Sequence, residues 1–321
     1  MISATFEVRV AARNIAATDI VSFELVDPAG GPLPPFSAGS HIDVHVADGL
    51  VRQYSLCNHP AETHRYQIGV LHDAASRGGS RGLHERLQAG DLIRISAPKN
   101  HFPLAAGARH SMLFAGGIGI TPILCMAERL AASGASFAMH YCARSRDRAA
   151  FLERIAAAPF ADRVRLHFDD EGAEQRLDLH ATLAEPAEGV HLYVCGPKGF
   201  MDATLATARA AGWPEDRLHY EFFSADVAPR DADEAFEVKL ASSGRSVVVP
   251  RDQTVIQALA AAGVALPSSC EQGVCGTCLT RVIDGIPDHR DLFLTREEQA
   301  LNDQFTPCCS RAKSHVLVLD I

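Results

Sequence analysis

The stretch CEQGVCGTC, residues 270–278, places three cysteines within nine residues, and a fourth, Cys308, follows after 29 intervening residues. The chain has nine cysteines, an odd number, and its N-terminus lacks the charged and apolar segments of a secretory signal. In a reducing compartment, crowded thiols of this kind bind metal rather than form disulfides. The four cysteines therefore predict a metal centre in the C-terminal part of the chain.

The spacing C-x4-C-x2-C followed by a distant cysteine is that of plant-type [2Fe–2S] sites. Two irons bridged by two sulfides need two thiolates each, and a tight loop supplies three of them while a distant segment supplies the fourth. Gly273 and Gly276 allow the loop to bend, so that its N–H groups can point at the sulfurs. The predicted ligands are Cys270, Cys275, Cys278 and Cys308.

Two alternatives to this ligand set arise from the same residues. A structural zinc site also takes four cysteines, but zinc usually binds two short C-x2–4-C pairs, so the spacing favours iron. Cys309 adjoins Cys308, and neighbouring residues seldom aim both side chains at one point. We expect Cys308, and not Cys309, to be the fourth ligand.

The overall composition is that of a globular protein with several domains. At about 150 residues per domain, 321 residues predict two domains, or three small ones. With 47% apolar and 21% charged residues, the chain can form substantial cores, and it is neither disordered, collagen-like nor a coiled coil as a whole. Its net charge of −9 and pI of about 5.9 argue against nucleic acid or anionic lipid as a partner.

No segment is expected to enter a membrane. The longest apolar run, residues 111–127, is interrupted by three glycines and Pro122 and is too short to span a bilayer. We therefore expect a soluble, cytoplasmic protein with no membrane contact. We also expect a monomer.

Residues 1–104 carry short alternating segments such as HIDVHV at 41–46 and RYQIGV at 65–70, separated by turn clusters such as PAGGPLPP at 28–35. Period-two alternation broken by Gly and Pro predicts an antiparallel barrel or sandwich. One short helix is expected near residues 82–87. The first domain is thus predicted to be an antiparallel β-barrel.

Residues 105–225 show a different rhythm, in which short apolar strands alternate with helices. Strands are expected at 111–115, 137–141, 164–168, 191–194 and 218–222, and helices near Thr121, Asp147, Asp178 and Pro197. This βαβ order predicts a Rossmann-like α/β domain, a mainly parallel sheet with helices on both faces.

Residues 226–235 are polar and contain Pro, as in a linker, and residues 236–321 form a third domain. Strands are expected at 236–240 and 246–249, a helix at 254–262, and a closing strand at 315–321. Thr295 and Glu298 fit a capping box for a further short helix. The pattern predicts a small α+β unit.

Two elements of the first domain indicate a phosphate-bearing ring compound. RQYSLCN at 52–58 ends a predicted strand, and SRGGS at 76–80 precedes the short helix. A guanidinium and a glycine-rich helix N-terminus together make a cradle for an anion. Tyr54 could lie against a flat ring, and Ser55 could hydrogen-bond a ring nitrogen. The same residues also fit an ordinary strand followed by a glycine turn that binds no ligand.

GGIGITP at 116–122 follows a predicted strand and opens a helix, with Thr121 expected at the N-cap and Pro122 at the first helical position. The motif lacks the third glycine of G-x-G-x-x-G. Cys195-Gly196-Pro197 ends the fourth strand, so the two elements should meet at the ligand crevice of the sheet. Together they predict dinucleotide binding.

The choice of nucleotide depends on the ends of the second and third strands. Arg144, after the second strand, could stack on adenine or hold a 2′-phosphate, whereas Asp169 and Asp170, after the third, would repel one. We expect NADH rather than NADPH. The predicted nucleotide-binding residues are Gly117, Gly119, Thr121, Pro122, Arg144, Cys195, Gly196 and Pro197.

With RQYSL, GGIGITP, CGP and C-x4-C-x2-C-x29-C in this order, the chain resembles the phthalate dioxygenase reductase family, which includes vanillate O-demethylase reductases. The resemblance covers essentially the whole length. It implies an FMN-binding β-barrel, an NAD-binding α/β domain and a plant-type ferredoxin domain of the β-grasp type. It also implies FMN rather than FAD, and an activity that passes electrons from NADH to a Rieske-type oxygenase.

The resemblance assigns roles by motif. Arg52, Tyr54 and Ser55 should hold the flavin ring and its phosphate, with Gly79 and Ser80 completing the phosphate site. Thr121 and Cys195 should lie near the nicotinamide, and Phe223 resembles the aromatic residue that stacks on the flavin.

A hydride carries two electrons and a [2Fe–2S] cluster accepts one, so a flavin must mediate between them. We assign no acid or base residue, and Cys195 only a positioning role. Two other functions remain open: a flavin and iron–sulfur reductase for a diiron monooxygenase, a haem protein or a separate ferredoxin, and a zinc-stapled interaction protein that is no enzyme.

Overall fold

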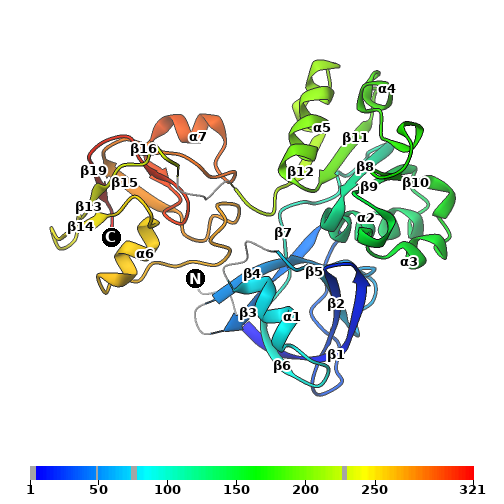
Figure 1. Cartoon of the computed structure of the whole chain (residues 1–321), viewed down its shortest axis with the longest axis horizontal. Coiled ribbons are helices and arrows are strands. Elements are labelled where there is room, and N and C mark those ends of the chain that lie inside the picture. The colour runs from blue at the N-terminus through cyan, green and yellow to red at the C-terminus, as the bar shows by residue number, and fades with distance from the viewer. Residues whose placement is uncertain (1–4, 48–49, 74–77, 226–229) are drawn as a thin grey trace. The chain divides into compact units, whose positions relative to one another are not determined.

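The computed structural model describes residues 5–47, 50–73, 78–225 and 230–321. The chain divides into two compact units, Met1–Glu221 and Phe222–Ile321 (Figure 1). In the described ranges no helix is both long and apolar enough to traverse a bilayer.

The first unit begins with an antiparallel sheet in the order β4-β3-β6-β1-β2-β5, with β7 paired to β3. An isolated bridge between Leu56 and Ile68 joins the end of the β4 segment to β5 and so closes the sheet into a barrel. The elements are β1 (Thr5–Ala17), β2 (Ile20–Val26), β3 (Ser40–Ala47), β4 (Leu50–Ser55), β5 (Tyr66–Leu71), α1 (Gly79–Arg86), β6 (Leu92–Ser96) and β7 (Lys99–Asn100).

Alternation along the strands forms the barrel core, as the sequence predicted. Ile42 and Val44 of β3 are buried in it beside Phe23 and Tyr66. His41 and Asp43, on the opposite face of β3, are buried as well. Strand β3 is therefore covered on both faces, and buried polar groups lie on its outer one.

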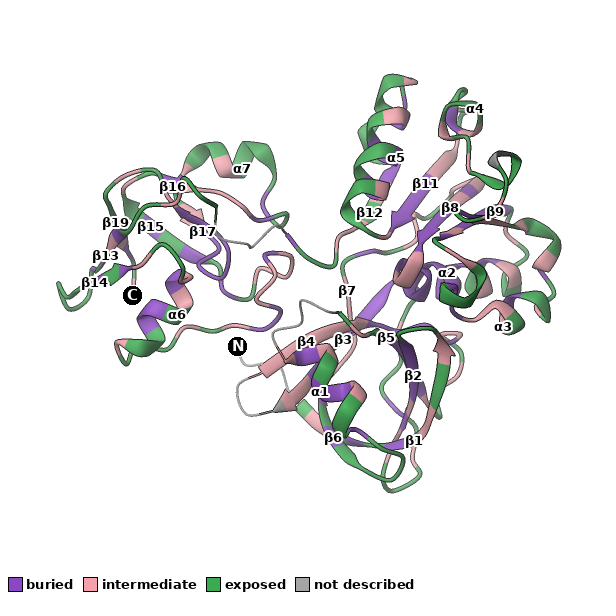
Figure 2. Ribbon diagram, viewed as in Figure 1, coloured by how far each residue is buried: buried purple, intermediate pink, exposed green. Residues whose placement is uncertain are grey.

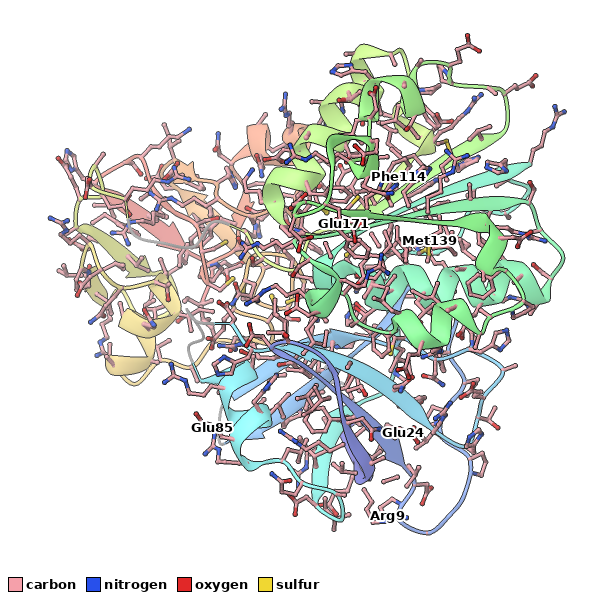
Figure 3. All side chains as sticks on the ribbon, turned by 45° about the vertical axis from the view of Figure 1, so that its right-hand side comes forward. Arg9, Glu24, Glu85, Phe114, Met139 and Glu171 are labelled. Carbon is pink, nitrogen blue, oxygen red and sulfur yellow. The ribbon has the colours of Figure 1, made fainter. Side chains whose placement is uncertain are left out.

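The second part of the first unit is a parallel sheet in the order β10-β9-β8-β11-β12. Figure 1 shows α2 and α3 on one side of it and α4 and α5 on the other. The elements are β8 (His110–Gly116), α2 (Ile120–Ala132), β9 (Phe137–Ala143), α3 (Leu152–Ala156), β10 (Val164–Phe168), α4 (Leu179–Leu183), β11 (Val190–Cys195), α5 (Lys198–Ala210) and β12 (Leu218–Glu221). Phe114 and Met139, on neighbouring strands, are fully buried, whereas Glu85 on α1 is exposed (Figure 3).

Two helix starts differ from the sequence-based prediction. A 3-10 turn at Gly117–Gly119 runs directly into α2, so the helix begins at Ile120. Thr121 is inside the helix rather than at its N-cap, and its hydroxyl donates to the carbonyl of Ile118 (3.0 Å). Pro122 is the third residue of the helix, whereas the sequence predicted it as the first. Near Asp147 the chain forms only a 3-10 turn, and α3 begins at Leu152. Helix α2 is buried along most of its length (Figure 2).

The second unit is a mixed sheet in the order β14-β13-β19-β15-β17, with α6 contributing to its core. β13 and β19 pair in parallel, and their neighbours pair antiparallel, which is the β-grasp arrangement. The capping boxes at Thr254 and Thr295 are both formed, the second as predicted. The elements are β13 (Phe236–Leu240), β14 (Ser246–Val249), α6 (Val255–Ala261), β15 (Thr280–Asp284), β16 (Pro287–Asp288), α7 (Arg296–Leu301), β17 (Gln304–Phe305), β18 (Arg311–Ala312) and β19 (Val316–Leu319).

Candidate functional site

Arg52 of β4 lies across the start of α1. A Cβ on Gly79 would be 2.6 Å from Arg52 Cγ and 3.0 Å from its Nε, so only glycine lets the side chain approach this closely. The helix follows Gly78 at φ 97°, has no side-chain cap and carries no acidic residue in its first turn. The helix N-terminus and the guanidinium thus form a positive cradle that suits a phosphate.

The remaining residues of this cradle are Ser80 and the segment before α1. The Ser80 hydroxyl accepts a hydrogen bond from the backbone N–H of Asp73 (3.2 Å). Ser76 and Arg77, which the sequence motif included, lie outside the described residues. The structure therefore brings Arg52, Gly79 and Ser80 together at one end of the barrel.

Tyr54 and Ser55 end β4 next to this cradle. Burial raises the pKa of the Tyr54 phenol, so the side chain is neutral. Ser55 is 5% exposed, and its hydroxyl donates to Glu221 Oε2 (3.3 Å). The barrel residue predicted to bind a flavin nitrogen therefore touches the last residue of the parallel sheet.

The carboxyl ends of β8, β11 and β12 lie side by side, which aligns Ala115, Cys195 and Glu221. Cys195 is fully buried, and burial together with the Glu221 carboxyl raises the pKa of its thiol, which stays protonated. A Cβ on Gly119 would lie 2.2 Å from the Cys195 carbonyl oxygen, and one on Gly196 would lie 2.9 Å from Gly116 Cα. The two glycine turns pack backbone to backbone.

Glu221 is a site residue that sequence reasoning missed. Its side chain is 14% exposed, and burial raises the pKa of its carboxyl to about 7, against a small lowering by the Ser55 hydrogen bond. His41 Nδ1 is 3.9 Å from Glu221 Oε1. The available signal was a single acidic residue at the carboxyl end of a predicted parallel strand.

A chain of hydrogen bonds orients His41. Lys99 Nζ donates to Asp43 Oδ2 (2.7 Å), and Gln53 Nε2 donates to Asp43 Oδ1 (2.9 Å). Because the carboxylate only accepts, the Gln53 amide nitrogen faces it, and the same nitrogen is 3.2 Å from His41 Nε2. Burial lowers the pKa of His41 to about 4. The neutral ring therefore accepts at Nε2 and carries its proton on Nδ1, toward Glu221.

The other predicted nucleotide residues lie around the same sheet edge. Thr121 is 2% exposed and lies against the barrel, since a Cβ on Gly69 would be 2.9 Å from its Cγ2. Arg144 follows β9 with an exposed side chain, and its carbonyl accepts from the N–H of Asp170 (3.2 Å). Pro197 is the N-cap of α5. Gly117 has φ 52°, which favours glycine.

In the second unit, glycines shape the cysteine loop. Gly273 and Gly276 have φ of 71° and 68°. A Cβ on Gly273 would be 2.6 Å from Cys309 Sγ, and one on Gly276 would be 2.2 Å from Phe293 Cζ. The N–H of Gln272 donates to Cys270 Sγ (3.3 Å). The loop thus turns its amide groups toward sulfur, as predicted from the glycines.

Among the four predicted ligands, Cys270 lies beside Cys275, and Cys308 lies beside both Cys278 and Cys309. A hydrogen bond from Cys270 lowers the pKa of Cys275 to about 5, and a hydrogen bond to Cys278 raises the pKa of Cys308. Across the described part of the chain no three acidic, histidine or cysteine groups converge as a single-ion site requires. Four cysteine sulfurs are the ligand set that a [2Fe–2S] cluster takes.

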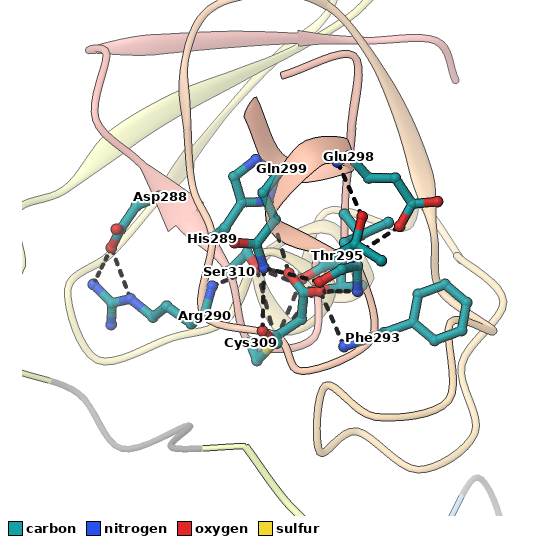
Figure 4. A network of polar contacts seen from close by, with 12 residues as sticks. Asp288, His289, Arg290, Phe293, Thr295, Glu298, Gln299, Cys309 and Ser310 are labelled. Carbon is teal, nitrogen blue, oxygen red and sulfur yellow. Dashed lines mark hydrogen bonds and ion pairs between the residues drawn. The ribbon is translucent and has the colours of Figure 1, made fainter. Parts of the chain in front are cut away.

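Cys309 is part of a buried polar network that includes Ser310 and Asp291 (Figure 4). Cys309 Sγ is 3.2 Å from Thr306 Oγ1 and 3.8 Å from Ser310 Oγ. Its pKa is raised, first by a hydrogen bond to Cys308 and then by burial. Cys309 therefore lies beside Cys308 and is hydrogen-bonded within this network.

Comparison with known proteins agrees with this arrangement. Residues 238–313 match the model for a 2Fe-2S iron-sulfur cluster binding domain, and residues 93–218 match that for the N-terminal domain of dimethylamine monooxygenase subunit DmmA-like proteins. The chain is 58% identical over 315 residues to a vanillate O-demethylase oxidoreductase of Pseudomonas sp. (strain HR199 / DSM 7063), covering 98% of this chain and 99% of the relative. A solved phthalate dioxygenase reductase is 38% identical and superimposes with a TM-score of 0.82, covering 99% of this chain and 98% of that one.

The chain belongs to the phthalate dioxygenase reductase family. It is an oxidoreductase that moves electrons from NADH through FMN and a [2Fe–2S] cluster to an oxygenase. The predicted fold class, enzyme class and cofactors are confirmed. The alternative of a zinc-stapled interaction protein is wrong, because the cysteine domain matches the iron–sulfur model.

Proposed function

We propose that this reductase supplies a terminal Rieske-type oxygenase that removes the methyl group of a methoxylated aromatic acid such as vanillate. The sequence identities to two groups of relatives support the proposal. Two vanillate O-demethylase oxidoreductases of Pseudomonas are 58% and 60% identical over nearly the whole chain, against 39% for the phthalate dioxygenase reductase of Burkholderia cepacia. A self-sufficient cytochrome P450 monooxygenase whose chain includes a matching part is 43% identical, which is also well below the identity to the two vanillate O-demethylase oxidoreductases.

The residues around the sheet edge and the barrel fit the family's cofactors. Arg52, Gly79 and Ser80 would hold the FMN phosphate, and Tyr54, Ser55 and Phe223 the flavin ring; Phe223 stands two residues after Glu221 and is 37% exposed. NADH would bind at Gly117, Gly119, Thr121, Pro122, Arg144, Cys195, Gly196 and Pro197. Cys270, Cys275, Cys278 and Cys308 would bind the cluster.

Two of this chain's own residues, Ser55 and Glu221, are placed to accept the proton that the oxidation of NADH releases. Oxidation of one NADH by one-electron acceptors yields NAD⁺, two electrons and one proton, and a flavin supplies the step from hydride to single electrons. The Ser55 hydroxyl and the Glu221 carboxyl lie at the junction of barrel and sheet, with Glu221 half-ionised near pH 7. Glu221 would accept that proton at Oε2 through Ser55, while His41 Nδ1–H faces its other oxygen.

The proposal extends to the choice of nucleotide, the oligomeric state and the domain bounds. We infer NADH rather than NADPH from Asp169 and Asp170 after β10, a cytoplasmic monomer, and domains at 1–104, 105–225 and 236–321 joined by a linker at 226–235. All nine cysteines are free in the structure, as suits a reducing compartment.

The test of the proposal is electron transfer to a purified vanillate O-demethylase oxygenase. Cys308→Ser should keep NADH-dependent ferricyanide reduction largely intact, because ferricyanide takes electrons from the flavin, and should abolish NADH-driven vanillate turnover. Cys309→Ser is the matched control and should retain both activities and the cluster absorption. Vanillate turnover with Cys308→Ser, or equal loss of both activities in protein that still holds flavin, would contradict the assigned electron order.

A further inference from the structure

The segment that follows Glu221 is bound to the cysteine loop of the second unit within four residues. The N–H of Ala225 donates to the carbonyl of Gln272, at 2.7 Å. Ala225 is 6% exposed, and a Cβ on Gly273 would lie 3.1 Å from the Ala225 methyl group. Ala225 is therefore packed and hydrogen-bonded against the loop between Cys270 and Cys275.

The same segment is bound a second time at Asp233, eight residues after Ala225. The Asp233 carboxylate accepts two hydrogen bonds from the guanidinium of Arg290, one of them from Nη1 at 2.9 Å. The two side chains are 5% and 6% exposed, and Arg290 also pairs with Asp288 (2.7 Å). Arg311 Nη2 donates to the carbonyl of Glu234 (2.9 Å). A buried bidentate pair of this kind holds its partners in one geometry.

We propose that Ala225 is a positioning residue for electron transfer, because its bond to Gln272 leaves only Phe222–Ser224 to connect the flavin site with the cluster loop. The Cα atoms of Glu221 and Ala225 are four peptide steps apart, so the chain limits their separation to at most about 14 Å, wherever the units lie. If Ala225 were not bound to Gln272, the next fixed residue of the second unit would be Asp233, which is twelve peptide steps after Glu221.

This inference rests on the proposed function, in which two electrons from each NADH pass singly from the flavin site to the cluster and one proton is released. The rate of such an intramolecular encounter depends on the length of the tether, since effective concentration falls roughly as the −3/2 power of its length. A fourfold to fivefold change is easily resolved by stopped-flow absorbance of the cluster.

The experiment compares one Gly/Ser insertion at two positions in the holoenzyme. About eight residues inserted between Ser224 and Ala225 lengthen the four-step span to twelve, which should slow NADH-driven cluster reduction about fivefold. The same insertion within residues 226–229 lies between the two fastened points and should leave the rate unchanged. NADH–ferricyanide turnover and the cluster spectrum should be the same in both.

Two substitutions test the fastening directly. Ala225→Pro removes the N–H donor and should slow cluster reduction about fivefold, since the span then runs to Asp233. Ala225→Gly keeps the N–H and should stay near the wild-type rate.

The possible results distinguish the fastening at Ala225 from the proposed oxygenase partner. If both insertions slow cluster reduction equally, by about twofold, the segment is a free linker and the inference is wrong. If neither insertion slows cluster reduction, the length of the segment does not limit the rate, and the inference is wrong as well. If wild-type protein reduces its cluster with NADH but fails to support vanillate turnover, the proposed partner fails while the fastening remains testable.

Discussion

At the residue scale, environment rather than residue type decides the chemistry of the site. Ser55 and Cys195 were predicted from short motifs, because each stands next to a glycine turn or a strand end. Glu221 and His41 were not, because their importance arises from burial against segments far away in the sequence: Glu221 meets Ser55 across 166 positions. Spacing within one motif carries no information on such a contact.

Glu221→Gln should change how stability depends on pH. The pKa of this carboxyl is about 7 in the folded protein against 4.5 as its ordinary value, so the folded state binds more protons between these values. The unfolding free energy should therefore fall by about 3 kcal/mol in wild type as the pH rises from 4.5 to 7. The Gln variant should lack this loss.

Urea unfolding at pH 5 and pH 8 checks this prediction. Glu85→Gln, an exposed change on α1, is the control and should follow wild type. Parallel pH dependence of wild type and Glu221→Gln would refute a raised carboxyl pKa. The proposed proton role adds that activity should rise through pH 7 in wild type and not in the Gln variant.

At the element scale, turns and caps read from the sequence were mostly right, and the exceptions have local causes. The capping box at Thr295 and Glu298 formed as predicted, because both partners lie within one helical turn. The N-cap expected at Thr121 was wrong, because a 3-10 turn at Gly117–Gly119 extends the helical path toward β8. Sequence alone does not distinguish a cap from a residue already inside a turn.

Gly119→Ala should destabilise the first unit by about 1–3 kcal/mol and raise the KM for NADH. The new Cβ would lie 2.2 Å from the carbonyl oxygen of Cys195, and backbone atoms cannot move aside as a flexible side chain can. Gly199→Ala is the control: it lies in α5 with nothing within 4 Å of its Cβ position, and should be neutral or slightly stabilising. Denaturant unfolding and NADH kinetics measure both. Equal behaviour of the two variants would show that the turn tolerates the side chain.

At the scale of the whole molecule, Arg154 of α3 joins the barrel to the parallel sheet within the first unit. Its Nη1 donates to Gln67 Oε1 (2.6 Å) and its Nη2 to the Cys57 carbonyl (3.0 Å), both in the barrel. The same guanidinium pairs with Glu128 of α2 (2.7 Å). One side chain thus bonds three segments, which fixes the barrel against the sheet whose edge faces Ser55.

Arg154→Lys should destabilise the first unit by about 3 kcal/mol, because an ammonium group cannot reach three partners and Glu128 stays largely buried. Arg146→Lys is the control, since its pair with Glu171 is exposed and should change stability by less than about 0.5 kcal/mol. Thermal or denaturant unfolding compares the two. A loss for Arg154→Lys as small as for the control would show that this junction is held by apolar packing instead.

The sequence by itself determined the three structural classes and the iron–sulfur domain, because strand alternation, βαβ rhythm and cysteine spacing are properties of neighbouring residues. The four cluster ligands that it names stay a prediction. Tertiary structure alone decided that Glu221 is buried beside Ser55 and His41. It also decided that Ala225 is bound to the cysteine loop. The physical reason is that desolvation and hydrogen bonding depend on which distant segments exclude water from a group, and no local pattern encodes that.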